Sequence, residues 1–317
     1  MSVHHPGDRC RLSCGEFPFR YALAGMTFLS QIELSSVPTL KPSTKLLFIR
    51  RSQVPAHLEF PEFVEPDLEF GQGKFLIKIP SVARYLIIDG GEIVVDPHTK
   101  ASPSELQAYL LGSALAVACH QRGIIPLHCS AVDVRDGCVL FMGPSGAGKS
   151  TLAALLRERG HHVIADDVCY LRGGNKAETW ISPGLNRLRL WKDTLIAMGY
   201  EDLRGFKQEF AGYEKFLVPM PATSQQARRL RGIYYLSPSE PPARIVPVKG
   251  VEAVELLIHN VYRLFYAKIL GKHMAAVQAC VATSSAVPSF RFYRPLSFDR
   301  SLETLRILED HLETSFT

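Results

Sequence analysis

Between residues 17 and 96, short apolar runs alternate with breaks that contain Pro and Gly. Short runs bounded in this way are typical of β-strands. The strands predicted on this basis are Met26–Ile32, Leu46–Arg50, Phe75–Ile79, Tyr85–Ile88 and Glu92–Val95. Frequent prolines keep such strands short and place some of them at sheet edges. The pattern therefore predicts a smaller β-rich N-terminal domain over residues 1–100.

The pattern becomes helical at Ser102. The run Ser102-Pro103-Ser104-Glu105 combines an N-cap Ser, Pro at the first helical position and Glu three residues after the cap. This predicts a helix that begins there and continues to about Arg122. Gly123 can end it in a left-handed conformation.

A strand, loop, helix and strand follow. Two strands are predicted over Leu127–Val134 and Cys138–Met142, with a two-residue turn at Asp136-Gly137 between them. A helix is predicted over Lys149–Arg159, and a short apolar run, Val163–Ala165, comes after it. This order is typical of an α/β core.

Beyond residue 172 the pattern is weaker but continues in the same style. The predicted elements are strands at Leu185–Leu190 and Ile233–Leu236 and helices at Val251–Leu270, Met274–Ala282 and Ser301–Leu312. We expect them to complete an α/β domain over residues 101–317.

The composition is that of a folded, soluble protein. Of the 317 residues, 46% are hydrophobic and 21% are charged, and the net charge of +5 comes from dispersed Lys and Arg. Dispersed basic residues do not follow a phosphate backbone, so no nucleic-acid partner is predicted. No apolar stretch is long enough to cross a bilayer, and the N-terminus lacks a signal-peptide pattern, so no membrane partner is predicted.

The seven cysteines are odd in number and include no CxxC pair. They indicate reduced thiols and a cytoplasmic location. His4, His5, Cys10 and Cys14 gather near the N-terminus. Polar residues of a frayed terminus explain them better than a metal site does, so none is predicted there.

Residues 143 to 150 match the phosphate-loop pattern GxxxxGK[ST], directly after an apolar strand and directly before a helix. Glycines allow successive backbone N–H groups to converge on phosphate oxygens above the positive end of the helix. Lys149 adds a mobile positive charge, and the Ser150 hydroxyl can bind Mg²⁺. The sequence predicts a nucleoside triphosphate site formed by Gly143, Pro144, Ser145, Gly146, Ala147, Gly148, Lys149, Ser150 and Thr151.

Two acidic residues, Asp166 and Asp167, end the short strand after the loop helix. A parallel strand beside the loop strand would bring them to the phosphate end of the sheet. One aspartate suffices for the magnesium contact of an ordinary ATPase, so the second is the informative one. An aspartate near a phosphate can accept a proton from an attacking hydroxyl.

The hairpin before the loop places a histidine. If Asp136-Gly137 is a two-residue turn, counting back along the strands sets His128 opposite Ser145. His128 is therefore predicted to lie beside the phosphate loop.

At these residues the chain resembles the C-terminal catalytic domain of HPr kinase/phosphorylase, a bacterial P-loop serine kinase, and its HPr-kinase-related branch. The shared features are Leu127-His128-Cys129-Ser130-Ala131-Val132, the loop from Gly143 to Ser150, and Arg159-Gly160-His161 leading to Ala165-Asp166-Asp167. The similarity covers about Leu127 to Leu171. It implies an α/β P-loop kinase domain of the HPr kinase type after the β-rich N-terminal domain, with ATP and Mg²⁺ as cofactors.

The resemblance also implies roles for single residues. Asp167 would be the general base toward a substrate serine, His128 would assist at the phosphate site, and Lys149 would hold the phosphates. Ser150 and Asp166 would hold Mg²⁺. HPr kinase relatives are commonly oligomeric, which implies a homo-oligomer.

The acceptor is less defined. Segments around Phe19-Arg20-Tyr21 and Gly25-Met26-Thr27 resemble the branch found beside ribosomal-peptide gene clusters. Some relatives there are similar to lasso-peptide kinases, which phosphorylate a C-terminal serine of a precursor peptide. The Gly- and Glu-containing second signature of true HPr kinases is missing, and Arg187, Arg189 and Asp193 occupy that region.

Three functions stay open on this basis. The first is an ATP-dependent kinase of a serine on a protein or peptide. The second is a regulatory module that binds a nucleotide as a conformational signal and has no phosphoryl acceptor. The third is a kinase of a small metabolite.

Overall fold

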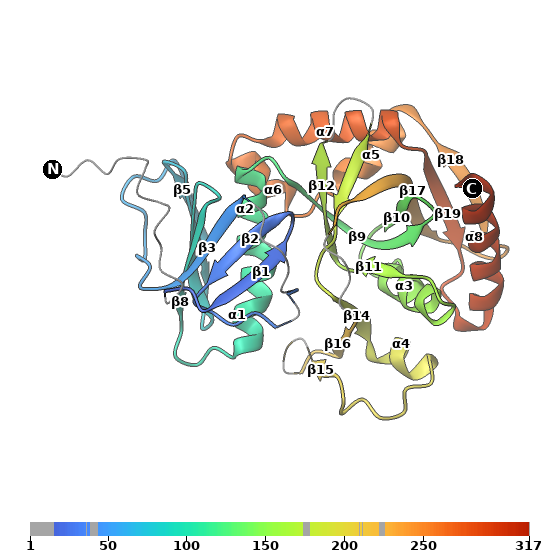
Figure 1. The fold of residues 1–317 in the computed structure, drawn as a ribbon, viewed down its shortest axis with the longest axis horizontal. Helices are drawn as coiled ribbons and strands as arrows, with labels where there is room; N and C mark the ends of the chain where they lie inside the picture. The colour runs from blue at the N-terminus through green and yellow to red at the C-terminus, as the bar shows by residue number, and fades with distance from the viewer. Residues whose placement is uncertain are drawn as a thin grey trace.

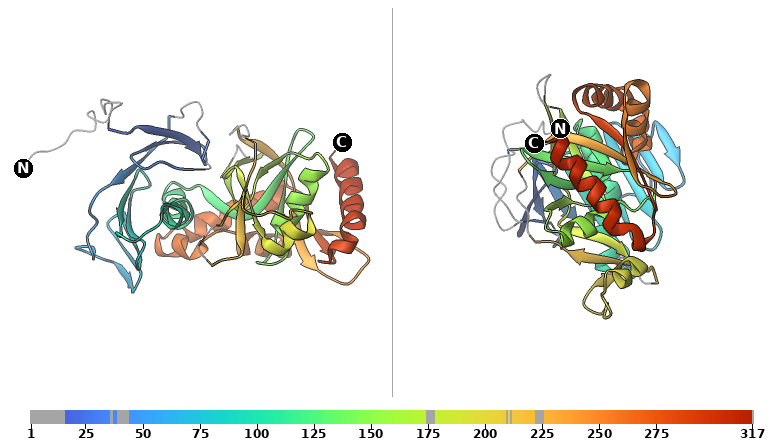
Figure 2. Two further views of the ribbon diagram at one scale, coloured as in Figure 1. Left: turned by 90° about the horizontal axis from the view of Figure 1, so that it is seen from below. Right: turned by 90° about the vertical axis from the view of Figure 1, so that its right-hand side faces the viewer.

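The computed structural model describes residues 16–35, 37–38, 44–173, 178–208, 210, 212–221 and 226–316. Two large sheets form its two ends, and a small third sheet lies below the second (Figure 1). The elongated arrangement is also evident in Figure 2. The fold is mixed α/β with a β-rich N-terminal region, as the sequence predicts.

The first sheet contains the eight strands β1 to β8, in the order β1-β2-β3-β8-β7-β6-β5-β4. All five strands predicted in this region are present. Three short ones were not predicted: β1, β4 and β5. The bounds are β1 Phe19–Leu23, β2 Met26–Ser30, β3 Leu46–Arg51, β4 Phe63–Glu65, β5 Leu68–Gly71, β6 Lys74–Ile79, β7 Ala83–Ile88 and β8 Glu92–Pro97.

The predicted helix begins at Ser102, whose side chain accepts from the Glu105 amide while Glu105 bonds back to the cap. It comprises α1 (Pro103–Tyr109), a π-helical segment η2 (Leu110–Ala114) and α2 (Leu115–Gln121). Gly123 has the expected positive φ of 69°. The helix packs against the first sheet and shares its apolar core. A domain boundary at residue 100 stays a prediction.

The second sheet follows the order β10-β9-β12-β13-β17-β19-β18, and β11 joins it by pairing with β9. Strand β10 also pairs with β17 in parallel. Because β9 lies between β10 and β11, the strand before Asp166 is not beside the loop strand, contrary to expectation. The bounds are β9 Ile125–Val134, β10 Gly137–Met142, β11 Val163–Ala165, β12 Val168–Gly173, β13 Thr179–Ser182, β17 Arg228–Pro238, β18 Arg244–Val248 and β19 Ser289–Arg294.

Helices cover both faces of the second sheet. Successive side chains of a strand point to opposite faces. In β10, Val139 and Phe141 pack in one core with α3 (Lys149–Glu158) and α8 (Ser301–Ser315). Cys138, Leu140 and Met142 pack on the other face, in the core that α5 (Gly250–His259) and α7 (His273–Ala286) share. The loop strand is thus buried on both sides, which fixes where its C-terminal end and the phosphate loop lie.

The hairpin register differs from the prediction by two residues. The turn residues are Arg135 and Asp136, with Val134 opposite Gly137 and Cys129 opposite Met142. Asp136 takes the left-handed conformation at φ 59°. Gly137 is needed within β10, because a Cβ there would lie 2.2 Å from the Arg229 carbonyl oxygen of β17. A contact with a distant strand, rather than turn chemistry, decides the role of this glycine.

A small sheet of order β14-β16-β15 projects from the second sheet near the phosphate loop (Figure 1). Only β14 was predicted, two residues too early at its start. The elements of this part are β14 Arg187–Trp191, α4 Lys192–Ala197, β15 Lys207–Gln208 and β16 Lys215–Pro219.

The long helix predicted over Val251–Leu270 is two helices, α5 and α6 (Leu264–Ile269). The break occurs where the chain bonds to β9: the Tyr262 amide donates to the Pro126 carbonyl, and Arg263 has φ 55°. The last helices, α7 and α8, are found as predicted, and a 3-10 turn, η3 (Phe298–Arg300), precedes α8.

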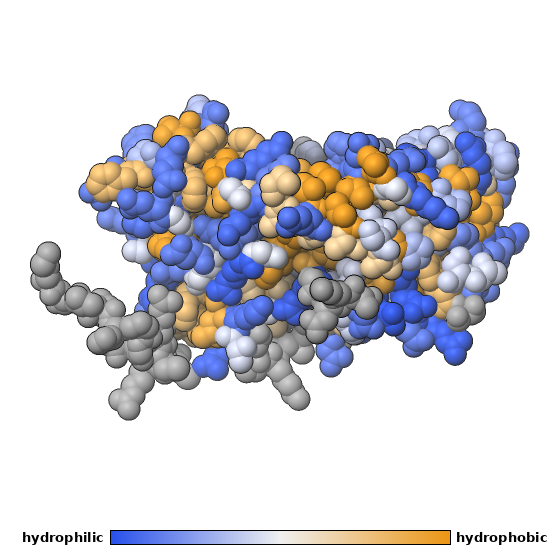
Figure 3. Space-filling view, turned by 90° about the horizontal axis from the view of Figure 1, so that it is seen from above, coloured by the Kyte–Doolittle hydropathy of each residue, from blue (hydrophilic) through white to orange (hydrophobic). Residues whose placement is uncertain are grey.

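Exposed apolar side chains gather on the face that carries α5 to α7 (Figure 3), among them Val251, Phe265, Met274 and Val281. No helix of the described chain is long and apolar enough to span a bilayer. The five described cysteines are buried free thiols. The N-terminal group His4, His5, Cys10 and Cys14 lies outside the described residues.

Candidate active site

The phosphate loop connects β10 to α3 in a conformation that requires glycine at three positions. Gly143, Gly146 and Gly148 have φ of 147°, 84° and 79°, a region that side chains other than glycine rarely adopt. A Cβ on Gly148 would also lie 2.1 Å from the Arg294 guanidinium. The loop therefore forms an open cradle at the N-terminus of α3, the kind of site that binds phosphate.

Lys149 folds back over this cradle. Its Nζ donates to the carbonyl oxygens of Gly143 at 2.8 Å and Pro144 at 3.1 Å. Burial lowers its pKa, and Asp166 opposes that change. An arriving phosphate can replace the two carbonyls as the partner of this ammonium group without a change in the backbone.

Two residues far away in the sequence hold the loop. The Asn260 side-chain oxygen accepts from the Gly143 amide at 3.1 Å. The Arg294 guanidinium donates to the carbonyls of Ala147 and Gly148, each at 3.1 Å. Arg294 is buried, and burial lowers its pKa to about 10. It places a positive charge against the loop and in the lining of the adjoining cavity.

Asp166 is buried within three hydrogen bonds. Its Oδ1 accepts from the hydroxyls of Ser130 at 2.6 Å and Ser150 at 3.0 Å, and its Oδ2 accepts from the Arg189 amide at 2.9 Å. Because the Ser150 hydroxyl donates its proton to Asp166, its oxygen lone pairs are available to a cation. Hard oxygen donors of this kind suit Mg²⁺, which takes its other ligands from phosphate and water. The two residues thus fit a magnesium ion.

Asp167 takes a left-handed backbone conformation, with φ 77°. Its carbonyl accepts from the Cys129 amide at 3.2 Å and from His128 Nδ1 at 2.9 Å, which supports this uncommon geometry. Its carboxylate forms an ion pair with Arg189. Burial on its own would raise the pKa of Asp167, but the positive charge of Arg189 overcomes it, so the pKa lies below its usual range. Asp167 is therefore an anion at neutral pH.

His128 is a neutral imidazole with one defined tautomer. Burial, and then the nearby Lys149, lower its pKa below the usual value. Since Nδ1 faces a carbonyl oxygen, Nδ1 carries the proton and Nε2 has a lone pair. His128 can therefore accept a hydrogen bond or a proton at Nε2.

His128, Asp167, Lys149, Ser150 and Arg294 line one cavity of about 280 Å³ at the loop, whereas Asp166 does not line it. Lys149, Arg189, Lys215 and Arg294 supply positive charge, and Asp167 and Asp193 supply negative charge. The excess of positive charge suits a polyphosphate. His128 lines the same cavity as Ser145, so the predicted proximity is confirmed even though the register that led to it is wrong.

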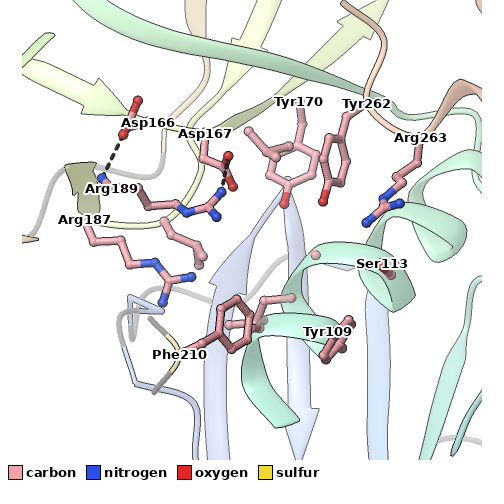
Figure 4. A pocket seen from close by; sticks show the side chains of 15 residues that line it. Tyr109, Ser113, Asp166, Asp167, Tyr170, Arg187, Arg189, Phe210, Tyr262 and Arg263 are labelled. Atoms are coloured by element: carbon pink, nitrogen blue, oxygen red, sulfur yellow. Dashed lines mark hydrogen bonds and ion pairs between the residues drawn. The ribbon is translucent and has the colours of Figure 1, made fainter. Parts of the chain in front are cut away.

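A second cavity, of about 260 Å³, adjoins the first. Asp167 and Arg189 line both, and Figure 4 shows their ion pair beside Tyr170 and Tyr262. The carboxylate of Asp167 thus stands where the two spaces meet. No cluster of three or more His, Cys, Asp or Glu side chains able to hold a metal occurs in the described chain.

The structure brings all the predicted site residues together, with Thr151 also lining the phosphate-loop cavity. Their catalytic and binding roles stay predictions. Sequence reasoning gave no role to Ser130, Arg189, Asn260 or Arg294. Ser130 lies in the segment Leu127-His128-Cys129-Ser130, on which the resemblance partly rests. Arg189 lies in the region where the second signature is missing. The sequence therefore gave a weak indication that both residues belong to the site. Asn260 and Arg294 carried none.

Comparison with known proteins supports part of the sequence interpretation. The chain is 36% identical over 83 residues to HPr kinase/phosphorylase of Geobacter sulfurreducens, covering 26% of this chain and 24% of that protein. It is 53% identical over 45 residues to HPr kinase/phosphorylase of Chlorobium phaeovibrioides, 14% of each chain. Part of this chain is therefore similar in sequence to proteins named HPr kinase/phosphorylase.

The HPr-kinase-like match spans about a quarter or less of the length of these relatives. A match of similar size, 34% identity over 86 residues, is found with phosphoenolpyruvate carboxykinase (ATP) of Bradyrhizobium diazoefficiens, covering 27% of this chain and 14% of that protein. The solved HPr(Ser) kinase/phosphatase of Coxiella burnetii aligns with a TM-score of 0.32 at 12% identity, covering 60% of this chain and 97% of that one. No family model matches the chain.

Proposed function

We propose that this protein is an ATP- and Mg²⁺-dependent kinase that transfers the γ-phosphoryl group to a serine hydroxyl of a protein or peptide. The observation that carries the proposal is the position of Asp167. Its ionised carboxylate lines both the phosphate-loop cavity and the second cavity. A base that faces donor and acceptor spaces together is what direct phosphoryl transfer requires.

The residues divide into a donor side and an acceptor side. On the donor side, loop amides, Lys149 and Arg294 bind the phosphates and stabilise the charge that develops on them. Ser150 and Asp166 would hold Mg²⁺, which when bound would neutralise charge on the phosphates. On the acceptor side, Asp167 takes the hydroxyl proton as the serine oxygen attacks the γ-phosphorus. The bond from that phosphorus to the bridging oxygen breaks, and ADP leaves.

His128 has a positioning role beside Asp167. Its Nδ1–H holds the Asp167 carbonyl, and so keeps the backbone in the conformation that directs the carboxylate. Its neutral Nε2 accepts a hydrogen bond from the acceptor hydroxyl or from water. The partial similarity to proteins named HPr kinase/phosphorylase supports the proposal of a kinase.

Incubation of the purified protein with γ-labelled ATP, Mg²⁺ and either HPr or a precursor peptide encoded beside its gene tests the proposal. We expect label on a serine of one acceptor, identified by mass spectrometry. Tight ATP binding with no label in a broad acceptor panel would instead favour the regulatory module. Label on a small metabolite alone would identify the third alternative.

The Arg189–Asp167 ion pair predicts a pH effect. Removing the guanidinium in Arg189→Met leaves the burial of Asp167 less opposed, so the pKa of Asp167 rises. If the reaction needs the carboxylate ionised, the acid limb of the rate profile moves to higher pH. The measurement is the rate of transfer against pH for the wild type and the variant. Because Arg189 also lines the phosphate-loop cavity, its replacement can lower the maximal rate as well. The test is therefore the pH at which the acid limb lies, and not the maximal rate.

Arg204→Met is the matched control. Arg204 is exposed, pairs with Asp202 at the surface and lines neither cavity. Its acid limb should coincide with that of the wild type. An unchanged limb in Arg189→Met would show that ionisation of Asp167 does not control the rate.

A further inference from the structure

The lining of the second cavity contains no residue of the phosphate loop. It lies between the small sheet, the Asp166-Asp167 turn, the α5–α6 break and the η2 segment (Figure 4). Its volume of about 260 Å³ is below the range usual for drug-sized ligands. It can therefore enclose a single side chain with its neighbouring backbone, but not a folded surface.

The lining is aromatic and basic. Tyr109, Tyr170, Phe210 and Tyr262 form much of the wall. Tyr109 contacts Phe210 with their ring centroids 6.3 Å apart, so residues from α1 and from the small sheet region close the same space. The shape of the cavity therefore depends on both α1 and the region of the small sheet.

Three arginines line it against two aspartates: Arg187, Arg189 and Arg263 against Asp166 and Asp167. Asp166 accepts from two serine hydroxyls and an amide, and Asp167 pairs with Arg189. Arg263 has no carboxylate partner in the described part of the chain, and lies over the rings of Tyr262 at 5.5 Å and Tyr266 at 5.8 Å. The wall away from Asp167 is thus suited to an anion.

Three uncommon backbone features border this space. Gly112 and Ser113 belong to the π-helical segment η2. Asp167 and Arg263 both have positive φ. Single turns of π-helix and left-handed non-glycine residues concentrate at functional sites, because their cost persists only where the surroundings hold them. Their coincidence around one cavity marks it as a binding site.

We infer that this cavity binds the phosphoryl acceptor and selects a hydroxyl group carried close to a carboxylate. The inference rests on the proposed kinase function. The hydroxyl lies toward Asp167, and the carboxylate lies toward Arg263, whose guanidinium can bind both of its oxygens. The carboxylate can come from an acidic side chain beside the serine, from a chain terminus or from a free hydroxy acid.

A matched acceptor series tests the inference with the full chain, γ-labelled ATP and Mg²⁺. Two peptides differ only in Asp or Asn directly after a single serine. Two more end in that serine, as the free acid or as the amide. Free L-serine is the fifth acceptor. We expect at least one acid to exceed its matched neutral form by roughly tenfold or more in kcat/KM, the effect of a charge-assisted hydrogen bond. The preferred pair identifies the source of the carboxylate.

Variants connect the preference to the cavity. Arg263→Met should reduce the preference for the acid, mainly through KM, and Arg263→Lys should restore part of it. Lys268→Met is the control, because Lys268 is an exposed cation of α6, the helix that Arg263 precedes, and does not line the cavity. It should keep the full preference.

Two results would overturn the inference, and they are distinguishable. Equal labelling of acids and neutral forms would reject the carboxylate selection while leaving the kinase proposal intact. ATP binding without label on any acceptor of this series or of the broader panel would reject the kinase itself, and the inference with it.

Discussion

Replacing Asp167 with Asn is expected to reduce phosphoryl transfer by roughly 10²- to 10⁴-fold, the usual contribution of a positioned general base. Asn has nearly the shape of Asp and is among the residues that best tolerate a positive φ, so the backbone at φ 77° should persist. It cannot accept the serine proton. Single-turnover transfer of labelled phosphate measures the effect, and a separate ATP titration should give an affinity within a few fold of the wild type.

The exposed carboxylate of Asp202 provides the matched control. Asp202→Asn makes the same chemical change at the surface and should retain wild-type transfer. Full transfer by Asp167→Asn would refute the assignment of Asp167 as the base. Loss of ATP binding in that variant would mean that the residue acts on the donor side.

Lys149→Met is expected to lower transfer by roughly 10²- to 10³-fold, as removal of one charged group from a preorganised phosphate site does. Met retains most of the apolar stem but cannot replace the ammonium that contacts Gly143 and Pro144 at the loop. In contrast to the Asp167 variant, ATP affinity should also fall. Transfer rate and ATP titration, measured on one preparation, check both parts.

Lys192→Met removes a surface cation that pairs with Glu214, and it should change neither quantity. Wild-type ATP affinity in Lys149→Met would show that the nucleotide binds elsewhere. The two variants together separate the leading alternatives. A regulatory module needs Lys149 but is indifferent to Asp167, whereas a kinase needs both.

Local signals in the sequence were sufficient for much of the fold. The capping box at Ser102, the glycine after the first helix and the run from β10 through the phosphate loop to α3 are found as predicted. Each depends on residues within a few positions of one another, so backbone preferences and hydrogen bonds decide them without distant partners.

Two predictions were wrong because residues distant in the sequence decide the local structure. The hairpin register was wrong because Gly137 serves a close approach of β17 and not the turn. The helix over Val251–Leu270 breaks because Tyr262 bonds to β9. Neither partner is near in sequence, and no local pattern reveals it.

The same division applies to the candidate site. The sequence by itself determined the glycine loop, its lysine and serine, and the paired aspartates, because close spacing along the chain dictates their chemistry. Only the tertiary structure decided which partners they meet: β14 brings Arg189 to Asp167, β19 brings Arg294 beneath the loop, and the α5–α6 break brings Asn260 to Gly143. Electrostatic effects depend on distance in space rather than along the chain, so the low pKa of Asp167 and the charge of both cavities follow from folding alone.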